Sequence, residues 1–78
     1  MTDIIWNDYA KNPTALLVLP LPRRGVTVAW RDANGQVYGC RDVTYGKMFE
    51  EIVKAWIRDA RDRGLKVEVT ARRARHLV

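Results

Sequence analysis

Hydrophobic residues recur with helical spacing over residues 44–63, and no other part of the chain has so regular a pattern. The apolar stripe consists of Tyr45, Met48, Phe49, Ile52, Val53, Trp56, Ile57 and Ala60. The positions between them are mostly charged, which is typical of a helix with one buried and one solvated face. Thr44 can cap the first turn with its hydroxyl, and Gly64 supplies the left-handed residue that often follows a helix. We therefore predict one long amphipathic helix over residues 44–63.

Two strands joined by a tight turn are predicted ahead of this helix, at residues 25–31 and 36–41. The Asn-Gly pair at 34–35 favours the positive φ angles of a two-residue hairpin turn, with Ala33 and Gln36 flanking it. Because side chains alternate between the two faces of a strand, the turn determines which residues share a face. The predicted core face carries Val26, Val28, Trp30 and Val37. The predicted outward face carries Thr27, Ala29, Arg31, Tyr38 and Cys40.

The remaining segments give weaker patterns. Residues 65–70 alternate between apolar and polar side chains, which predicts a strand with one solvated face. Residues 14–19 resemble a buried strand, but Pro20 cannot donate a ladder hydrogen bond, so we predict an edge strand. Residues 3–11 are predicted to form one or two helical turns that end before Pro13.

Together these elements predict an α+β fold, in which a small antiparallel-type sheet of three to four strands packs on one long helix in the order β-β-β-α-β. A chain of 78 residues supports one small core, so we expect a single domain over residues 1–78. Residues 71–78 are expected to form a flexible tail.

Charge points to an acidic partner. The chain has 14 Lys and Arg against 9 Asp and Glu, a formal net charge of +5. Such a balance favours binding to nucleic acid or to an acidic protein surface. No apolar run approaches the roughly 18 residues of a membrane span, and no leader pattern is visible. We therefore expect a cytoplasmic protein without a membrane partner.

The side chains needed for catalysis or for a metal site are scarce. One cysteine, Cys40, and one histidine, His76, are present, so neither a disulfide nor a Cys/His zinc cluster is expected. The glycines are scattered and form no phosphate-binding loop. We predict a protein that is not an enzyme and has no cofactor or metal.

Arginines supply the candidate binding residues. With the turn described above, Arg31 and Tyr38 become cross-strand neighbours on the outward sheet face, where they could stack on bases or reach phosphates. Two arginine clusters are further candidates, because guanidinium groups pair with phosphate or carboxylate oxygens. The first cluster is Arg23 and Arg24, and the second is Arg72, Arg73 and Arg75.

Two short passages resemble known families. The passage from Trp30 to Tyr38, followed by an amphipathic helix, resembles the amino-terminal arm-binding domains of phage integrases. That resemblance implies a sheet placed in the DNA major groove, with the strand at 65–70 as an addition to the family pattern. The passage from Asn34 through Asp42 into the helix is similar to a strand-turn-strand-helix passage of small phage anti-CRISPR proteins. That resemblance implies an inhibitor of a protein or ribonucleoprotein.

Two functions therefore stay open. The first is a small non-catalytic inhibitor or adaptor, of the kind encoded by phages and mobile elements, that acts on a protein or ribonucleoprotein complex. The alternative is a module that binds DNA or RNA through a basic sheet face. Asp32, Asp42 and Glu68 are expected on or near that face, and mixed charge disfavours simple phosphate binding. The sequence therefore favours the first function.

Overall fold

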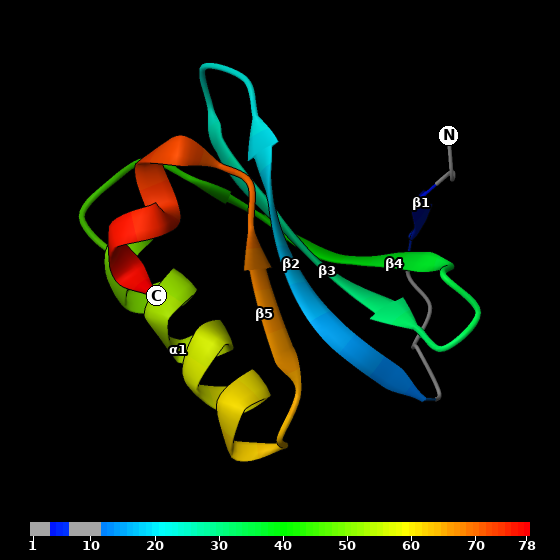
Figure 1. The fold of residues 1–78 in the computed structure, drawn as a ribbon. Coiled ribbons are helices and arrows are strands. Elements are labelled where there is room, and N and C mark those ends of the chain that lie inside the picture. The colour runs from blue at the N-terminus through cyan, green and yellow to red at the C-terminus, as the bar shows by residue number, and fades with distance from the viewer. Residues whose placement is uncertain (1–3, 7–11) are drawn as a thin grey trace.

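The structure is a computed structural model that describes residues 4–6 and 12–78, in which a five-stranded sheet packs against one long helix (Figure 1). The elements are β1 (Ile4–Trp6), β2 (Pro13–Leu21), β3 (Gly25–Asp32), β4 (Val37–Thr44), α1 (Phe49–Asp62), β5 (Lys66–Val69) and a final 3-10 helix, η1 (Arg72–Leu77). From β2 onward the order up to β5 is β-β-β-α-β, which confirms the predicted α+β class. Both helices lie on the same side of the sheet (Figure 1).

The sheet is mixed, with strand order β1-β4-β3-β2-β5. Strands β2, β3 and β4 form an antiparallel meander, whereas β5 is parallel to β2 and β1 is parallel to β4. The predicted edge position of β2 is therefore wrong, because β3 and β5 flank it on both sides. Pro13 and Pro20 are compatible with this interior position, since β5 pairs only with the four residues from Ala15 to Val18.

The predicted helical turn near the amino terminus is wrong for Ile4–Trp6, which form β1. Strand β1 pairs with the outer edge of β4, where Ile4 lies opposite Val37. β-branched and aromatic residues favour this pleated environment over a short isolated helical turn. The rest of the predicted turn, residue 3 and residues 7–11, lies outside the described residues.

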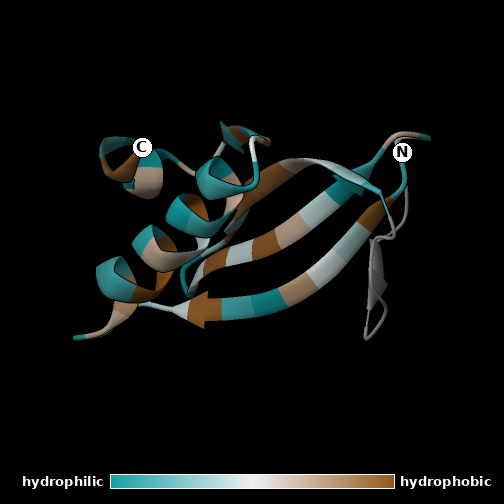
Figure 2. Cartoon of the chain, turned by 90° about the horizontal axis from the view of Figure 1, so that it is seen from below, coloured by the Kyte–Doolittle hydropathy of each residue, from teal (hydrophilic) through white to brown (hydrophobic). Residues whose placement is uncertain are grey.

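The main core lies between α1 and the sheet. Its largest fully buried side chains are Leu16, Val18, Val26, Val28, Val53 and Ile57. The rings of Trp30 and Trp56 pack edge to face at a centroid distance of 6.2 Å, an arrangement that aromatic pairs favour. Figure 2 shows hydrophilic and hydrophobic residues alternating along α1, as expected for a helix that buries one face.

Helix α1 begins later than the sequence predicts. Thr44 is the last residue of β4, and Met48 takes the N-cap position without a side-chain cap. The strand continues to Thr44 because Thr44 pairs with Gly25 of β3. Consequently Tyr45 and Met48 leave the predicted apolar stripe and are 40% and 60% exposed. The other end follows the prediction, since Gly64 has a φ of 74°.

The hairpin between β3 and β4 has a loop of three residues, 33–35, instead of two. The Asp32 N–H donates to the Gln36 carbonyl at 3.0 Å and so closes the hairpin around these residues. The Asp32 carboxylate accepts hydrogen bonds from the backbone N–H groups of Asn34 and Gln36, both at 2.9 Å. Gly35 donates to the Asp32 carbonyl at 3.1 Å and has a φ of 84°. This is the turn with a left-handed third residue that three-residue hairpins commonly use. The aspartate ahead of the Asn-Gly pair therefore selects the longer loop.

The longer loop changes the face that the first residues of β4 present. Trp30 now lies opposite Tyr38, and Arg31 lies opposite Val37. Residues directly opposite in an antiparallel pair share a face, so Tyr38 is on the α1 side and Val37 on the other, the reverse of the prediction. Ala29 lies opposite Gly39 and Val28 opposite Arg41, so Cys40 is a bulge residue without a partner position in β3. From Arg41 onward the pairing is the one that the two-residue turn predicted.

The close approach of β3 to β4 at Gly25 gives a first testable prediction. A Cβ added at Gly25 would lie 1.9 Å from the Val43 carbonyl oxygen, so Gly25→Ala must push two paired strands apart. We expect a loss of about 2 kcal/mol in the free energy of unfolding, which lowers the melting temperature by about 10 °C in a domain of this size. Gly46→Ala is the matched control, because a Cβ there has no atom within 4 Å. Equal melting temperatures for the two variants would contradict this packing.

Candidate functional site

Positive charge gathers at one end of the molecule. The β2–β3 turn, the β4–α1 loop and the C-terminal segment, residues 20–25, 44–48 and 70–78, contain six of the 14 Lys and Arg and no Asp or Glu. The rest of the chain has eight Lys and Arg against nine Asp and Glu, so these three segments account for the whole positive net charge. We call this region the arginine-rich end, and it comprises Arg23, Arg24, Lys47, Arg72, Arg73 and Arg75.

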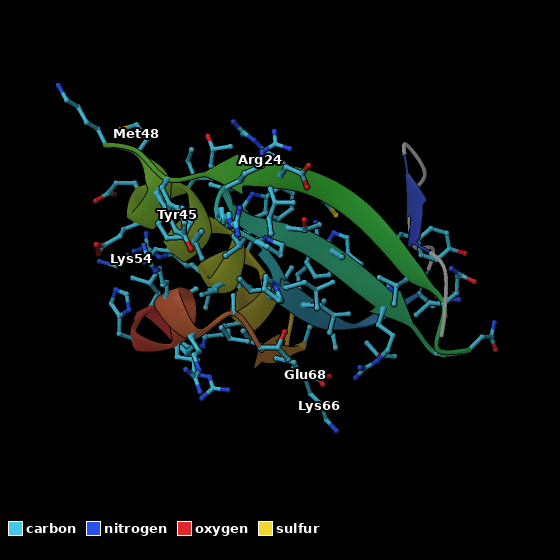
Figure 3. The ribbon with its side chains drawn as sticks, turned by 90° about the horizontal axis from the view of Figure 1, so that it is seen from above. Arg24, Tyr45, Met48, Lys54, Lys66 and Glu68 are labelled. Carbon is cyan, nitrogen blue, oxygen red and sulfur yellow. The ribbon has the colours of Figure 1, made fainter. Side chains whose placement is uncertain are left out.

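Tyr45 connects the three segments. Its backbone N–H donates to the Arg24 carbonyl at 2.9 Å, which ties the β4–α1 loop to the β2–β3 turn. The Arg73 guanidinium carbon lies 5.2 Å from the centroid of the Tyr45 ring, within the range of a cation–π contact. The same ring packs on Phe49 at a centroid distance of 4.9 Å. Figure 3 shows Arg24 and Tyr45 together near the start of α1.

The C-terminal segment, for which we predicted a flexible tail over residues 71–78, is folded onto the protein as η1. Ala71, Ala74 and Leu77 are buried in the main core. A 3-10 helix has three residues per turn, so residues three apart share one face, and that face is apolar here. The backbone N–H groups of Thr70 and Ala71 both donate to the Val18 carbonyl, at 3.0 and 3.2 Å. The spacing of these three apolar residues was the sequence signal that could have revealed a folded segment.

The same geometry places Arg72 and Arg75 next to each other on an exposed face of η1. Residues i and i+3 of a 3-10 helix eclipse one another, and a rise of about 2.0 Å per residue separates them by about 6 Å along the axis. Arg73 lies on another face, over Tyr45. Docking of η1 therefore fixes the backbone from which its arginines project.

The arginines of this end have no carboxylate partner in the described part of the chain. The ion pairs found there are Arg31 with Glu68, Arg63 with Asp59 at 3.3 Å, and His76 with Glu50 at 3.9 Å. None of them involves an arginine of the arginine-rich end. The positive charge of this surface is therefore not neutralised by ion pairs among the described residues.

The predicted pair of Arg31 and Tyr38 is not formed. Both terminal nitrogens of Arg31 donate to the two carboxylate oxygens of Glu68, across β2. Tyr38 lies opposite Trp30, on the other side of the sheet. A bidentate arginine–carboxylate pair holds the guanidinium in place, so Arg31 here joins β3 to β5. The sequence missed Tyr45 as a site residue because its apolar spacing assigned it to the helix.

The side chains considered for catalysis are not brought together. Cys40 is exposed at the bulge of β4, and partial desolvation of its thiol raises the pKa above the ordinary value, which disfavours the reactive thiolate. His76 is on η1 near Glu50. In residues 4–6 and 12–78 no group of His, Cys, Asp and Glu could hold a metal ion. An open depression of about 300 Å³ beside the β4–α1 loop is lined by residues 41–49 and Ile52.

None of the helices in the described part of the chain is long and apolar enough to cross a membrane. No protein-family model, curated protein or solved structure matches this chain.

The docking of η1 gives a second prediction. Leu77 is 8% exposed and belongs to the main core, so Leu77→Ala leaves a cavity there. We expect the free energy of unfolding to fall by about 2 kcal/mol or more, measured by urea denaturation. Val78→Ala is the control, because Val78 is 50% exposed and its truncation should change little. An unchanged stability of Leu77→Ala would mean that residues 71–78 are a tail after all.

Proposed function

We propose that this protein is a non-catalytic module that binds nucleic acid through phosphate contacts at its arginine-rich end. The observation that carries the proposal is the segregation of the whole net charge into three segments that meet at Tyr45. A polyanion is the partner that such a surface fits, because each phosphate can pair with a guanidinium group that has no partner of its own.

The side chains suit phosphate in particular. Five of the six cations are arginine, and Lys47 is the exception. The arginine fork matches two oxygens of a phosphate, and it loses less hydration on binding than a lysine ammonium. On η1, Arg72 and Arg75 are separated by about 6 Å along the axis, a spacing that allows contact with neighbouring phosphates of one strand.

Aspartate and glutamate side chains do not interrupt the three segments. From the sequence, the acidic residues expected on the sheet face favoured a protein partner. These residues, Asp32, Asp42 and Glu68, lie outside the three segments. Asp42 accepts a hydrogen bond from Thr27 at 2.8 Å, Glu68 holds Arg31, and Asp32 forms the β3–β4 turn. Along the chain, Asp42, Glu50 and Glu68 each lie two residues outside one of the segments, and Glu50 of α1 contacts His76 of η1 at 3.9 Å. Because the candidate site is now the arginine-rich end and not the sheet face, nucleic acid is favoured over a protein as its partner.

A second candidate function uses the same end. Tyr45 and Met48 are exposed beside the arginines, and tyrosine, methionine and arginine are enriched at protein interfaces. This composition favours a protein or ribonucleoprotein complex as the partner, on which the protein would act as an inhibitor or adaptor.

Salt dependence tests the nucleic-acid proposal. We expect affinity for DNA or RNA to fall as salt rises, and the double substitution of Arg72 and Arg75 by alanine to reduce the log–log slope by about 2. Fluorescence anisotropy titrations over a range of KCl concentrations measure both quantities. Arg58 and Arg61 form a matched control pair, because they have the same spacing and charge, are exposed on α1 and lie outside the arginine-rich end. Equal slopes for the two double variants would refute a phosphate role for η1.

The protein-directed function predicts a different response. A complex with a protein should survive nuclease treatment and change little with salt, since its anchors are Tyr45 and Met48. Replacing both by alanine should weaken it by at least tenfold, in the range found for interface anchors. Isothermal titration calorimetry with the purified partner measures the loss. If that substitution leaves the complex intact, these two residues are not its anchors.

A further inference from the structure

The tip of the β2–β3 hairpin carries an arginine in a strained backbone conformation. The Arg24 N–H donates to the Leu21 carbonyl at 3.0 Å, which closes a four-residue turn with Pro22 in its second position. Arg23, in the third position, has a φ of 67°. Among the described residues, Arg23 is the only one other than glycine that has a positive φ. Turns of this kind favour glycine or asparagine at that position, because a side chain is strained there.

The tip is also narrow, stiff and positive. Figure 1 shows the β2–β3 hairpin projecting beyond the body of the fold. Pro20 and Pro22 restrict its backbone, since each proline ring fixes φ. Arg23 and Arg24 are both exposed, and neither forms an ion pair within the described part of the chain. Strain and exposed charge at one projecting residue indicate that its side chain has a use other than folding.

Duplex DNA offers a groove that fits such a tip. The minor groove narrows at runs of A·T pairs, and its negative potential there attracts an inserted arginine. Single-stranded nucleic acid fits less well, because readers of unpaired bases use open aromatic faces for stacking. Residues 20–25 contain no aromatic side chain, and the Tyr45 ring, although part of it is exposed, already contacts Arg73 and Phe49.

We propose that the hairpin tip reads the minor groove of A·T-rich duplex DNA, with Arg23 as the inserted side chain. Arg72 and Arg75 then contact the neighbouring backbone phosphates. This inference rests on the proposed nucleic-acid function and adds its substrate class and the residue that sets its preference. It divides the site into one side chain that discriminates between duplexes and others that supply general affinity.

The test compares two duplexes of equal length, one with an A-tract and one of G·C pairs, by fluorescence anisotropy at fixed salt. We expect the parent protein to prefer the A-tract duplex by about tenfold, and a minor-groove ligand such as netropsin to displace it. Arg23→Gly should bring the ratio of affinities close to one. Its melting temperature should stay equal or rise, because glycine relieves the positive φ, so lost preference cannot be attributed to unfolding. Arg72→Ala is the matched control, which weakens binding to both duplexes and leaves their ratio unchanged.

The outcomes separate this inference from the proposed function. Equal affinity of the parent for both duplexes, tighter binding to a single strand, or an unchanged preference in Arg23→Gly would overturn minor-groove reading while nucleic-acid binding stands. Absence of binding to every duplex and single strand at low salt would remove the proposed function itself.

Discussion

The parallel pairing of β5 with β2 is the constraint on which the rest of this structure depends. Strand β5 follows β4 along the chain but pairs with β2, beyond β3, so the chain must cross over one face of the sheet, and α1 makes that crossing. The crossing brings the apolar stripe of α1 onto the sheet and buries Val53 and Ile57. It also returns the chain to the carbonyl of Val18, where Thr70 and Ala71 donate their N–H groups and η1 begins.

This closure determines where the charge lies. Strand β5 runs in the direction of β2, so it delivers η1 to the end at which β2 turns into β3 (Figure 1). The η1 segment and the β2–β3 turn, more than forty residues apart in sequence, thereby both contact Tyr45, η1 through the Arg73 side chain and the turn through the Arg24 carbonyl. Concentrating like charges in this way works against a compact fold through their repulsion. Burial of Ala71, Ala74 and Leu77 offsets that repulsion and holds η1 in place.

A single residue of loop length decides which sheet face each side chain of β4 occupies. The Asn-Gly pair favours a two-residue turn, but the Asp32 carboxylate binds two backbone N–H groups and stabilises a three-residue loop. Because side chains alternate with a period of two, this difference moves Tyr38 to the α1 side and separates it from Arg31. Arg31 and Tyr38 therefore lie on opposite faces of the sheet and do not form the predicted cross-strand pair.

The sequence by itself determined the fold class, the amphipathic helix with its end at Gly64, strands β2 to β5 and the basic charge, because these follow from local periodicity and composition. It also identified both arginine clusters. Only the tertiary structure decided that β2 is an interior strand, that Ile4–Trp6 form a strand, that residues 71–78 are docked, and that the two clusters share one end. These features depend on pairing between segments distant in the chain. Some of them rest on hydrogen bonds to backbone groups such as the Val18 carbonyl. Every residue type carries a backbone carbonyl, so the pattern of side chains does not reveal such bonds.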